Sequence, residues 1–546
     1  MILNNTKIKT ERANNLICWI ILGIILLIVI CVRSRLLEIP LERDEGEYAY
    51  CGQLILQLVP PYTAAYTMKL PGTCFAYALI MLLFGQTIKG IHLGLLFINC
   101  LSIILLFLIT KKLLNSRAAL IAALCYAILS VSPTVLGFAA HATHFIVLAA
   151  LAGTFLLLLC LENGRLTLYW GSGFLFGLAF LMKQQGIFFI FWGGFLILYR
   201  GLSSRPSSIK SIVMRLLIFG AGAILPFMSV VVIALLSGTF DKFWFWTFKY
   251  ASKYAGSIPI SEGVIFFLTN FLKVIKGFEL LWIVALIGIL SSFLDKRLRE
   301  VRWPILAFTL FSFLAICPGF YFRNHYFIML LPALALLVGI FINSLDYYLS
   351  SKFSNPFLNF IPLLVISSAI ILGINEHKKY FLFEKPVVLS RVIYGANPFI
   401  ESIKISEFIK SRTNPQEKIA VLGSEPQIYF YSQRHSATGY IYTYGLMEAQ
   451  EYQLSMQQEM IKEIERASPK YIIFVRILTS WLPKPESEKH IFKWVESYAQ
   501  RYYEPVGVVD IISPQVTRYI WGEEARTYEC VSPFTILIFE RRQAPN

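Results

Sequence analysis

Residues 16–32 read LICWIILGIILLIVICV and contain no charged side chain. Basic residues precede this run, and VRSRLLE follows it at the place where a signal-peptide cleavage site would need small residues. A helix of this length can cross most of a hydrocarbon core, which is about 30 Å thick. We therefore expect an uncleaved signal anchor at this point of the chain.

Apolar runs of similar length recur along the chain. Of the 546 residues, 56% are hydrophobic and 15% are charged, and the mean hydropathy is +0.62. Soluble chains have about 25% charged residues. We predict a polytopic α-helical membrane protein with about eleven spans, because each span needs close to 20 apolar residues. The expected spans lie at 16–32, 90–110, 118–136, 145–161, 168–182, 187–199, 212–236, 279–294, 303–317, 326–345 and 357–374.

The charge pattern indicates how the spans are oriented. The formal net charge is +16, from 49 Lys and Arg against 33 Asp and Glu. Cytoplasmic loops of membrane proteins collect Lys and Arg, and no basic, aromatic-lined groove indicates a nucleic-acid partner. With the N-terminus inside, the basic clusters fall in alternate loops. They contain Lys111, Lys112, Arg117, Arg165, Arg200, Arg205, Lys210, Arg215, Lys296, Arg297, Arg299, Arg302 and Lys352. This orientation places the loop 33–89 and everything after about Asn375 on the extracytoplasmic side.

The C-terminal part of the chain has a different composition. The runs EKIAVLG, KYIIFV, VGVVDII and FTILIFE are short and rich in β-branched residues, as strands are. NPFIESIKISEFIKSR, MQQEMIKEIERAS and IFKWVESYAQRYY have helical periodicity. We predict a transmembrane module at 1–375 and a soluble extracytoplasmic α/β domain at 376–546.

The loop 33–89 carries acidic and basic side chains together. ERDEGEYAY at 42–50 places four acids within six residues, and YTMKLPG at 66–72 adds Lys69. At a membrane surface, a carboxylate can remove a proton from an acceptor hydroxyl, and a cation can hold a departing phosphate. The simpler alternative is a solvated helix start, with Lys69 reaching the lipid headgroups.

The acidic stretch followed by Tyr-x-x-Lys-x-Pro resembles the first loop of the GT-C membrane glycosyltransferases, and the family 39 and 83 group most of all. That group includes protein O-mannosyltransferases and the transferase that adds aminoarabinose to lipid A. Further segments resemble the family in the same order along the chain. They are GLAFLMKQQGIFF at 177–189, FWFWTFKYASKYAG at 243–256 and FRNHYFIMLLPALALL at 322–337.

The resemblance implies roles for particular residues. Asp44 matches the catalytic acid of the family, and Glu45 matches the supporting acid beside it. Tyr66 and Lys69 match the Tyr-x-x-Lys that contacts the lipid phosphate. The full set expected to bind donor or acceptor is Arg43, Tyr48, Tyr66, Lys69, Lys253, His325, Tyr326, His141 and His144.

One segment departs from the family pattern. Many members carry a second acid in a segment like A-x-A-E-H-F, whereas this chain reads GFAAHATHFIVL, with Thr143 at that position. The change puts a metal site made of two carboxylates in doubt. His141 and His144 stand three residues apart, as two metal ligands can, but no third ligand is near them in sequence. We therefore assign no metal site and no certain cofactor, and a divalent cation stays as an alternative.

The resemblance implies an inverting glycosyltransferase that takes a sugar from a polyprenyl phosphate. The acceptor would be a hydroxyl of a lipid, a protein or a glycan, with Asp44 as general base and Lys69 holding the lipid phosphate. We expect a multi-pass protein of the plasma (inner) membrane, in contact with membrane lipids, whose C-terminal domain is extracytoplasmic. The alternative is a transporter or lipid flippase, which would carry polar residues near the bilayer midplane.

Overall fold

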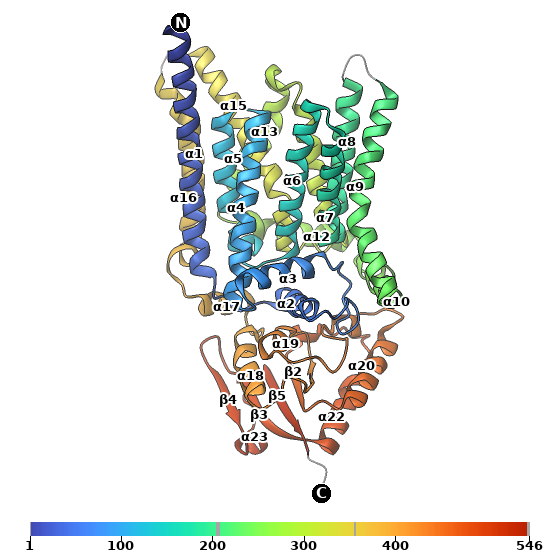
Figure 1. Cartoon of the computed structure of the whole chain (residues 1–546). Coiled ribbons are helices and arrows are strands. Elements are labelled where there is room, and N and C mark those ends of the chain that lie inside the picture. Colours follow the sequence, from blue (N-terminus) through green and yellow to red (C-terminus); the bar gives the residue numbers. More distant parts are fainter. Residues whose placement is uncertain (1, 204–207, 354–355, 543–546) are drawn as a thin grey trace. The chain divides into compact units, whose positions relative to one another are not determined.

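The computed structural model describes residues 2–203, 208–353 and 356–542 (Figure 1). Arg205 of the basic clusters and residues 543–546 of the predicted C-terminal domain lie outside these ranges. The chain divides into two compact units. The first contains Met1–Leu36, His92–Val231 and Tyr254–Glu384, and the second contains Leu37–Ile91, Val232–Lys253 and Lys385–Asn546. The second unit thus includes two segments that the sequence-based expectation groups with the transmembrane module.

The first unit is built from helices that run alongside one another (Figure 1). Its α-helices are α1 (Ile2–Leu36), α4 (Ile88–Leu113), α5 (Ser116–Leu129), α6 (Ala142–Asn163), α7 (Leu166–Met182), α8 (Ile187–Ser203), α9 (Ile209–Leu236), α12 (Ile260–Ile275), α13 (Glu279–Leu294), α14 (Arg302–Ile316), α15 (Leu331–Lys352) and α16 (Ile361–Glu376). Between them lie the short 3-10 helices η1 (Pro133–Val135), η2 (Gln184–Gly186), η4 (Lys296–Leu298), η5 (Asn324–Met329) and η6 (Pro356–Phe360), and the π-helix η7 (Lys379–Phe383) follows α16. α4 begins and α9 ends inside the second unit.

Six helices of the described chain are long and apolar enough to cross a membrane, or seven with one bent pair. The six are Asn15–Leu36, Ile88–Leu113, Ala142–Asn163, Gln184–Ser203, Ile209–Leu236 and Leu331–Lys352. Each predicted span coincides with an apolar helix, but five of these helices have only 10–17 residues. The protein is therefore a multi-pass membrane protein, and the predicted count of about eleven spans is not confirmed.

Exposed apolar residues and closely packed glycines indicate which surfaces of the first unit face lipid and where its helices pack together. Leu16, Ile24 and Leu27 of α1 are exposed, as apolar residues that face a membrane are. Where helices pack, small residues let their backbones come close. A Cβ at Gly173 of α7 would lie 2.0 Å from the carbonyl oxygen of Phe219 in α9. Only glycine therefore fits at this crossing.

The second unit contains a five-stranded sheet with the order β1–β2–β5–β3–β4. β1 and β2 are parallel, and the other neighbouring pairs are antiparallel. The four predicted runs form β1, β2, β3 and β5, whereas β4 lies outside them. The strands are β1 (Ile419–Leu422), β2 (Tyr471–Arg476), β3 (Tyr503–Ile511), β4 (Thr517–Trp521) and β5 (Thr535–Arg541).

Helices of the second unit come from all three of its chain segments. The first segment gives α2 (Arg43–Leu56) and α3 (Gly72–Phe84), and the second gives α10 (Phe240–Trp244), the π-helix η3 (Phe245–Tyr250) and α11 (Ala251–Ala255). The third gives α17 (Pro386–Tyr394), α18 (Phe399–Ser411), α19 (Gln427–Ser432), η8 (Tyr444–Leu446), α20 (Gln453–Ala467), α21 (Leu478–Trp481), α22 (His490–Tyr502) and α23 (Glu524–Thr527). α18, α20 and α22 confirm the three predicted helices of the C-terminal domain.

α2 is joined to the C-terminal segment by buried polar contacts. The backbone N–H of Leu41 donates to the Tyr431 hydroxyl at 2.9 Å, and the N–H of Ser436 donates to the Tyr50 hydroxyl at 2.8 Å. Each contact satisfies a backbone donor that would otherwise be buried without a partner. The acidic loop and the sheet domain therefore fold as one unit, although more than half of the chain separates them in sequence.

The close approach of α2 to α19 gives a stability prediction. A Cβ at Gly46 would lie 2.7 Å from the backbone nitrogen of Gln427, whereas a Cβ at Gly220 of α9 meets nothing within 4 Å. We expect Gly46→Ala to cost about 1–3 kcal/mol through overpacking. Gly220→Ala, the matched helical control, should leave the midpoint of thermal unfolding in detergent unchanged or slightly higher. Equal midpoints for both variants would show that α2 and α19 can move apart freely.

Candidate functional site

The first turn of α2 is built from two of the four acids in the stretch ERDEGEYAY at 42–50. Glu42 is the N-cap, and its carboxylate accepts the N–H of Glu45 at 3.0 Å. The Glu45 carboxylate accepts the N–H of Glu42 at 3.3 Å in return, which makes a capping box. Burial, with added repulsion from Asp44 and Glu45, raises the pKa of Glu42 well above its usual value. Glu45, predicted to support catalysis, is fully buried and holds the helix start.

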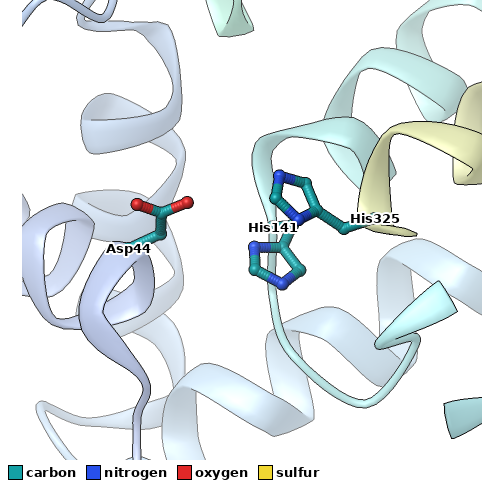
Figure 2. Close-up of side chains that lie close together, drawn as sticks. All are labelled: Asp44, His141 and His325. Atoms are coloured by element: carbon teal, nitrogen blue, oxygen red, sulfur yellow. The ribbon is translucent and has the colours of Figure 1, made fainter. Parts of the chain in front are cut away.

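The other two acids bind Lys69. The Lys69 ammonium lies 2.8 Å from Asp44 Oδ1 and 2.6 Å from Glu47 Oε2. Asp44 projects from the first turn of α2 (Figure 2), and its side chain is 21% exposed, while that of Glu47 is 3% exposed. The hydroxyl of Tyr442 lies 3.5 Å from the same Asp44 oxygen. Asp44 is thus the more exposed carboxylate of this pair.

The two carboxylates keep Lys69 charged. Burial alone lowers the pKa of a lysine, but Asp44 and Glu47 outweigh it and raise the pKa of Lys69 well above its usual value. The ammonium also lies 4.5 Å from the ring centre of Tyr48 and 5.7 Å from that of Tyr442. Aromatic faces attract cations at such distances. Tyr48 therefore contributes its ring to the Lys69 site, and burial raises the pKa of its hydroxyl.

Glu47 is a residue of the candidate site to which the sequence alone assigned no role. It stands three residues after Asp44, and residues three and four apart share one face of a helix. Tyr48, four residues after Asp44, lies on that face as well. Helical periodicity was thus the signal that could have identified Glu47 as the second partner of Lys69.

Arg43, predicted to bind substrate, is held by the C-terminal segment of its own unit. Its guanidinium donates to the Ser424 carbonyl oxygen at 2.6 Å, the Tyr444 hydroxyl at 2.7 Å and the Asn397 side-chain oxygen at 3.1 Å. It also forms a salt bridge of 2.9 Å with Glu425, whose side chain is fully buried. The structure therefore gives Arg43 a role in fixing α2 to the sheet domain.

Tyr66 and Lys69 form hydrogen bonds with different residues. Its hydroxyl donates to Glu463 Oε1 at 2.8 Å, and Lys242 lies 4.2 Å from the centre of its ring. Its ring stacks on Trp246 with centroids 5.8 Å apart. Burial and the nearby Glu463 raise the pKa of Tyr66. The Tyr66 hydroxyl is directed to Glu463, and the predicted role of Tyr66 beside Lys69 at a lipid phosphate stays a prediction.

Lys253, at the end of the second unit's middle segment, is an exposed cation. It pairs with Glu451 at 3.1 Å, and the two side chains are 53% and 57% exposed. Hydrogen bonding to Glu451 raises the pKa of Lys253. Its predicted role at a lipid phosphate stays a prediction.

The first unit gathers the predicted imidazole and phenol groups. The rings of His141, the N-cap of α6, and His325, in η5, stack with centroids 4.0 Å apart (Figure 2). Lys183 lies 4.0 Å from the ring centre of Tyr326, beside His325. α6 thus begins against η5, and this packing brings together side chains that are far apart in sequence.

His144 lies in the first turn of α6, where Thr143 is fully buried. His141 precedes that helix as its N-cap, three residues before His144. His141 faces His325 within this unit. The alternative of a divalent cation stays a prediction.

The comparisons with known proteins agree with this architecture. Residues 68–233 match the family described as dolichyl-phosphate-mannose-protein mannosyltransferase. No curated protein matches the sequence. Among solved structures, the archaeal oligosaccharyltransferase AglB from Archaeoglobus fulgidus, in complex with an inhibitory peptide and a dolichol-phosphate, is 13% identical. The likeness has a TM-score of 0.52 and covers 93% of this chain and 74% of AglB.

A second solved structure is similar over more of its own length. ArnT from Cupriavidus metallidurans, bound to undecaprenyl phosphate, is 13% identical with a TM-score of 0.57. The likeness covers 84% of this chain and 92% of ArnT. The resemblance to GT-C glycosyltransferases expected from the motifs is confirmed, and the chain shares their fold.

The Lys69 site gives a prediction about stability. Lys69→Met leaves Asp44 and the buried Glu47 facing each other without a cation, and removing one partner of a buried pair costs about 3–5 kcal/mol. We expect the loss to shrink when Glu47→Gln is combined with it, because the repulsion is then relieved. Denaturant unfolding of the two single variants and the double variant gives this coupling.

The control for this cycle is the exposed pair Lys253–Glu451, where Lys253→Gln should change stability very little because water screens both charges. Strict additivity of Lys69→Met and Glu47→Gln would contradict the proposed dependence of the acids on Lys69.

Proposed function

We propose that this protein transfers a sugar from a polyprenyl phosphate to an acceptor hydroxyl, on the extracytoplasmic face of the plasma (inner) membrane. The fold supports a lipid-linked donor, since the AglB and ArnT structures hold dolichol-phosphate and undecaprenyl phosphate. The observation that carries the proposal is the partly exposed carboxylate of Asp44, held beside a buried lysine. The C-terminal sheet domain lies on the same side of the membrane in this proposal.

Asp44 is the general base in the proposed reaction. The acceptor oxygen forms a bond with the anomeric carbon while its proton passes to the Asp44 carboxylate. The bond between that carbon and the phosphate oxygen breaks, and the polyprenyl phosphate leaves with the electron pair. A single displacement of this kind inverts the configuration of the sugar. The leaving group is already an anion of low basicity, so it needs no general acid.

Lys69 has two tasks in this proposal. An ammonium group has three donors, and Asp44 and Glu47 take two of them. These two bonds fix the direction of the third N–H. We assign it to an oxygen of the lipid phosphate, where a cation stabilises the charge of the leaving group. Glu47 keeps the ammonium in place while Asp44 accepts the proton.

The remaining predicted residues are assigned by resemblance and by their contacts. His325, Tyr326 and Lys253 assist at the phosphate, and His141 and His144 bind the sugar of donor or acceptor. These assignments rest on the order of motifs shared with the family. Arg43 and Tyr66 act through the position of α2 and of the loop after it, because their polar groups bond to the C-terminal segment.

The function is tested first by comparing cells with and without the protein. Mass spectrometry of their glycolipids and glycoproteins should show one sugar missing from one class of acceptor. That difference identifies the donor for a transfer assay with the purified protein. Unchanged glycolipid, glycoprotein and glycan profiles would overturn the proposed function.

Asp44→Asn tests the base directly. The amide keeps the shape of the side chain but takes up no proton, so transfer should fall by about 100-fold or more. Asp241→Asn changes an exposed acid of α10 and should transfer at the wild-type rate. Both variants should retain the donor lipid. An Asp44→Asn protein with near wild-type turnover would remove Asp44 from the role of base.

A further inference from the structure

A cavity of about 440 Å³ lies in the first unit, between the end of α13 and the last turns of α15. Its volume is in the range of cavities that bind small ligands, about 300–1,000 Å³. None of the groups assigned to sugar transfer lines it. The lining residues are Ser291, Leu294, Asp295, Lys296, Arg297, Phe341, Ser344, Leu345, Tyr347 and Tyr348.

The walls of this cavity are apolar and aromatic. Leu294 is 84% exposed, and Tyr347 and Tyr348 are 51% and 55% exposed. Leu345 and Phe341 are half-buried, and they lie about one and two helical turns before Tyr348 on α15. Exposed apolar side chains at the ends of two apolar helices are favourable where acyl chains cover them and unfavourable in water. The walls therefore fit a chain of hydrocarbon.

The rim of the cavity is positively charged. Arg297 donates two hydrogen bonds to Asp295, at 3.0 and 2.7 Å, and lies 3.5 Å from the ring centre of Tyr347. The Ser344 hydroxyl also donates to Asp295, at 3.0 Å. The negative charge of Asp295 is thus neutralised by Arg297. Lys296 is exposed, and its ammonium group has no hydrogen-bonded or ion-paired partner among the described residues, so its charge stays available at the rim.

The charges around the rim favour an anion. The segment 295–302 reads DKRLREVR, with four basic and two acidic residues. Basic pockets between transmembrane helices hold anionic lipid headgroups, and each Lys or Arg near a membrane surface contributes about 1 kcal/mol. A basic rim above an apolar wall matches the anionic headgroup and the acyl chain of a phospholipid.

We propose that this cavity binds an anionic phospholipid of the surrounding membrane. Its phosphate would lie at the Lys296 ammonium, and the first part of an acyl chain would lie along Leu294, Leu345 and Phe341. The proposal does not depend on the sugar-transfer reaction, because every residue it uses belongs to α13, η4 and α15. It makes these helix ends a lipid site separate from any donor site.

The test uses the full chain in detergent with two lipids that share the same acyl chains, phosphatidylglycerol and phosphatidylcholine. Native mass spectrometry measures how much of each lipid stays bound. We expect the wild-type protein to retain phosphatidylglycerol in preference. Lys296→Gln should weaken phosphatidylglycerol about 5-fold, which corresponds to about 1 kcal/mol for one lysine. Leu345→Trp fills the cavity and should reduce the binding of both lipids.

Lys352→Gln is the matched control, since it removes the same charge from the last residue of α15 without lining the cavity. It should bind phosphatidylglycerol as the wild type does. Equal retention of the two lipids by the wild type would overturn the proposal. So would equal losses of phosphatidylglycerol in Lys296→Gln and Lys352→Gln, since lipid would then respond to net charge and not to this rim. Unchanged binding by Leu345→Trp would exclude the cavity as the place of the acyl chain.

Discussion

The ammonium group of Lys69 is the contact on which the acidic helix α2 depends. Asp44 and Glu47 stand one helical turn apart, and both carboxylates bond to that one cation. Two acids at this spacing repel each other unless a cation lies between them. Because Glu47 is almost fully buried, the cation cannot be replaced by water at low cost. The position of the candidate base follows from this arrangement, with Asp44 at its exposed side.

The four acids of the stretch 42–50 divide into two pairs with the same spacing. Glu42 and Glu45 close the capping box, and Asp44 and Glu47 bind Lys69. The interpretation of these acids as a helix start is confirmed for Glu42 and Glu45, whereas the catalytic role of Asp44 stays a prediction. The motif is compact because one helical turn must serve both purposes.

The sequence predicted those features that depend on local pattern. Apolar runs located the helices, and β-branched runs located four of the five strands. Span ends were less well predicted, since α5 ends at Leu129 although its predicted span continues to residue 136, and α15 begins at Leu331 although its predicted span begins at residue 326. In a packed bundle, loops and short turns can take up the ends of such runs.

The partners of Arg43 and Tyr66 could not be predicted, because they come from the other end of the chain. Nothing local distinguishes a guanidinium that binds substrate from one that binds a buried glutamate. The compact unit that joins the loop 37–91 to the sheet is likewise a tertiary feature, made by contacts such as Leu41 with Tyr431.

The salt bridge between Arg43 and Glu425 also determines when α2 can be anchored during synthesis of the chain. The two residues are 382 positions apart in the chain, and synthesis proceeds from the N-terminus at about 5–20 residues per second. For the tens of seconds in between, the helix that carries Asp44 exists without its anchor. The acidic motif is among the first parts of the protein to be made, and its anchor follows 382 residues later. A ribosome-bound chain thus carries its candidate base in an unassembled state until β1 and the residues directly after it have been made.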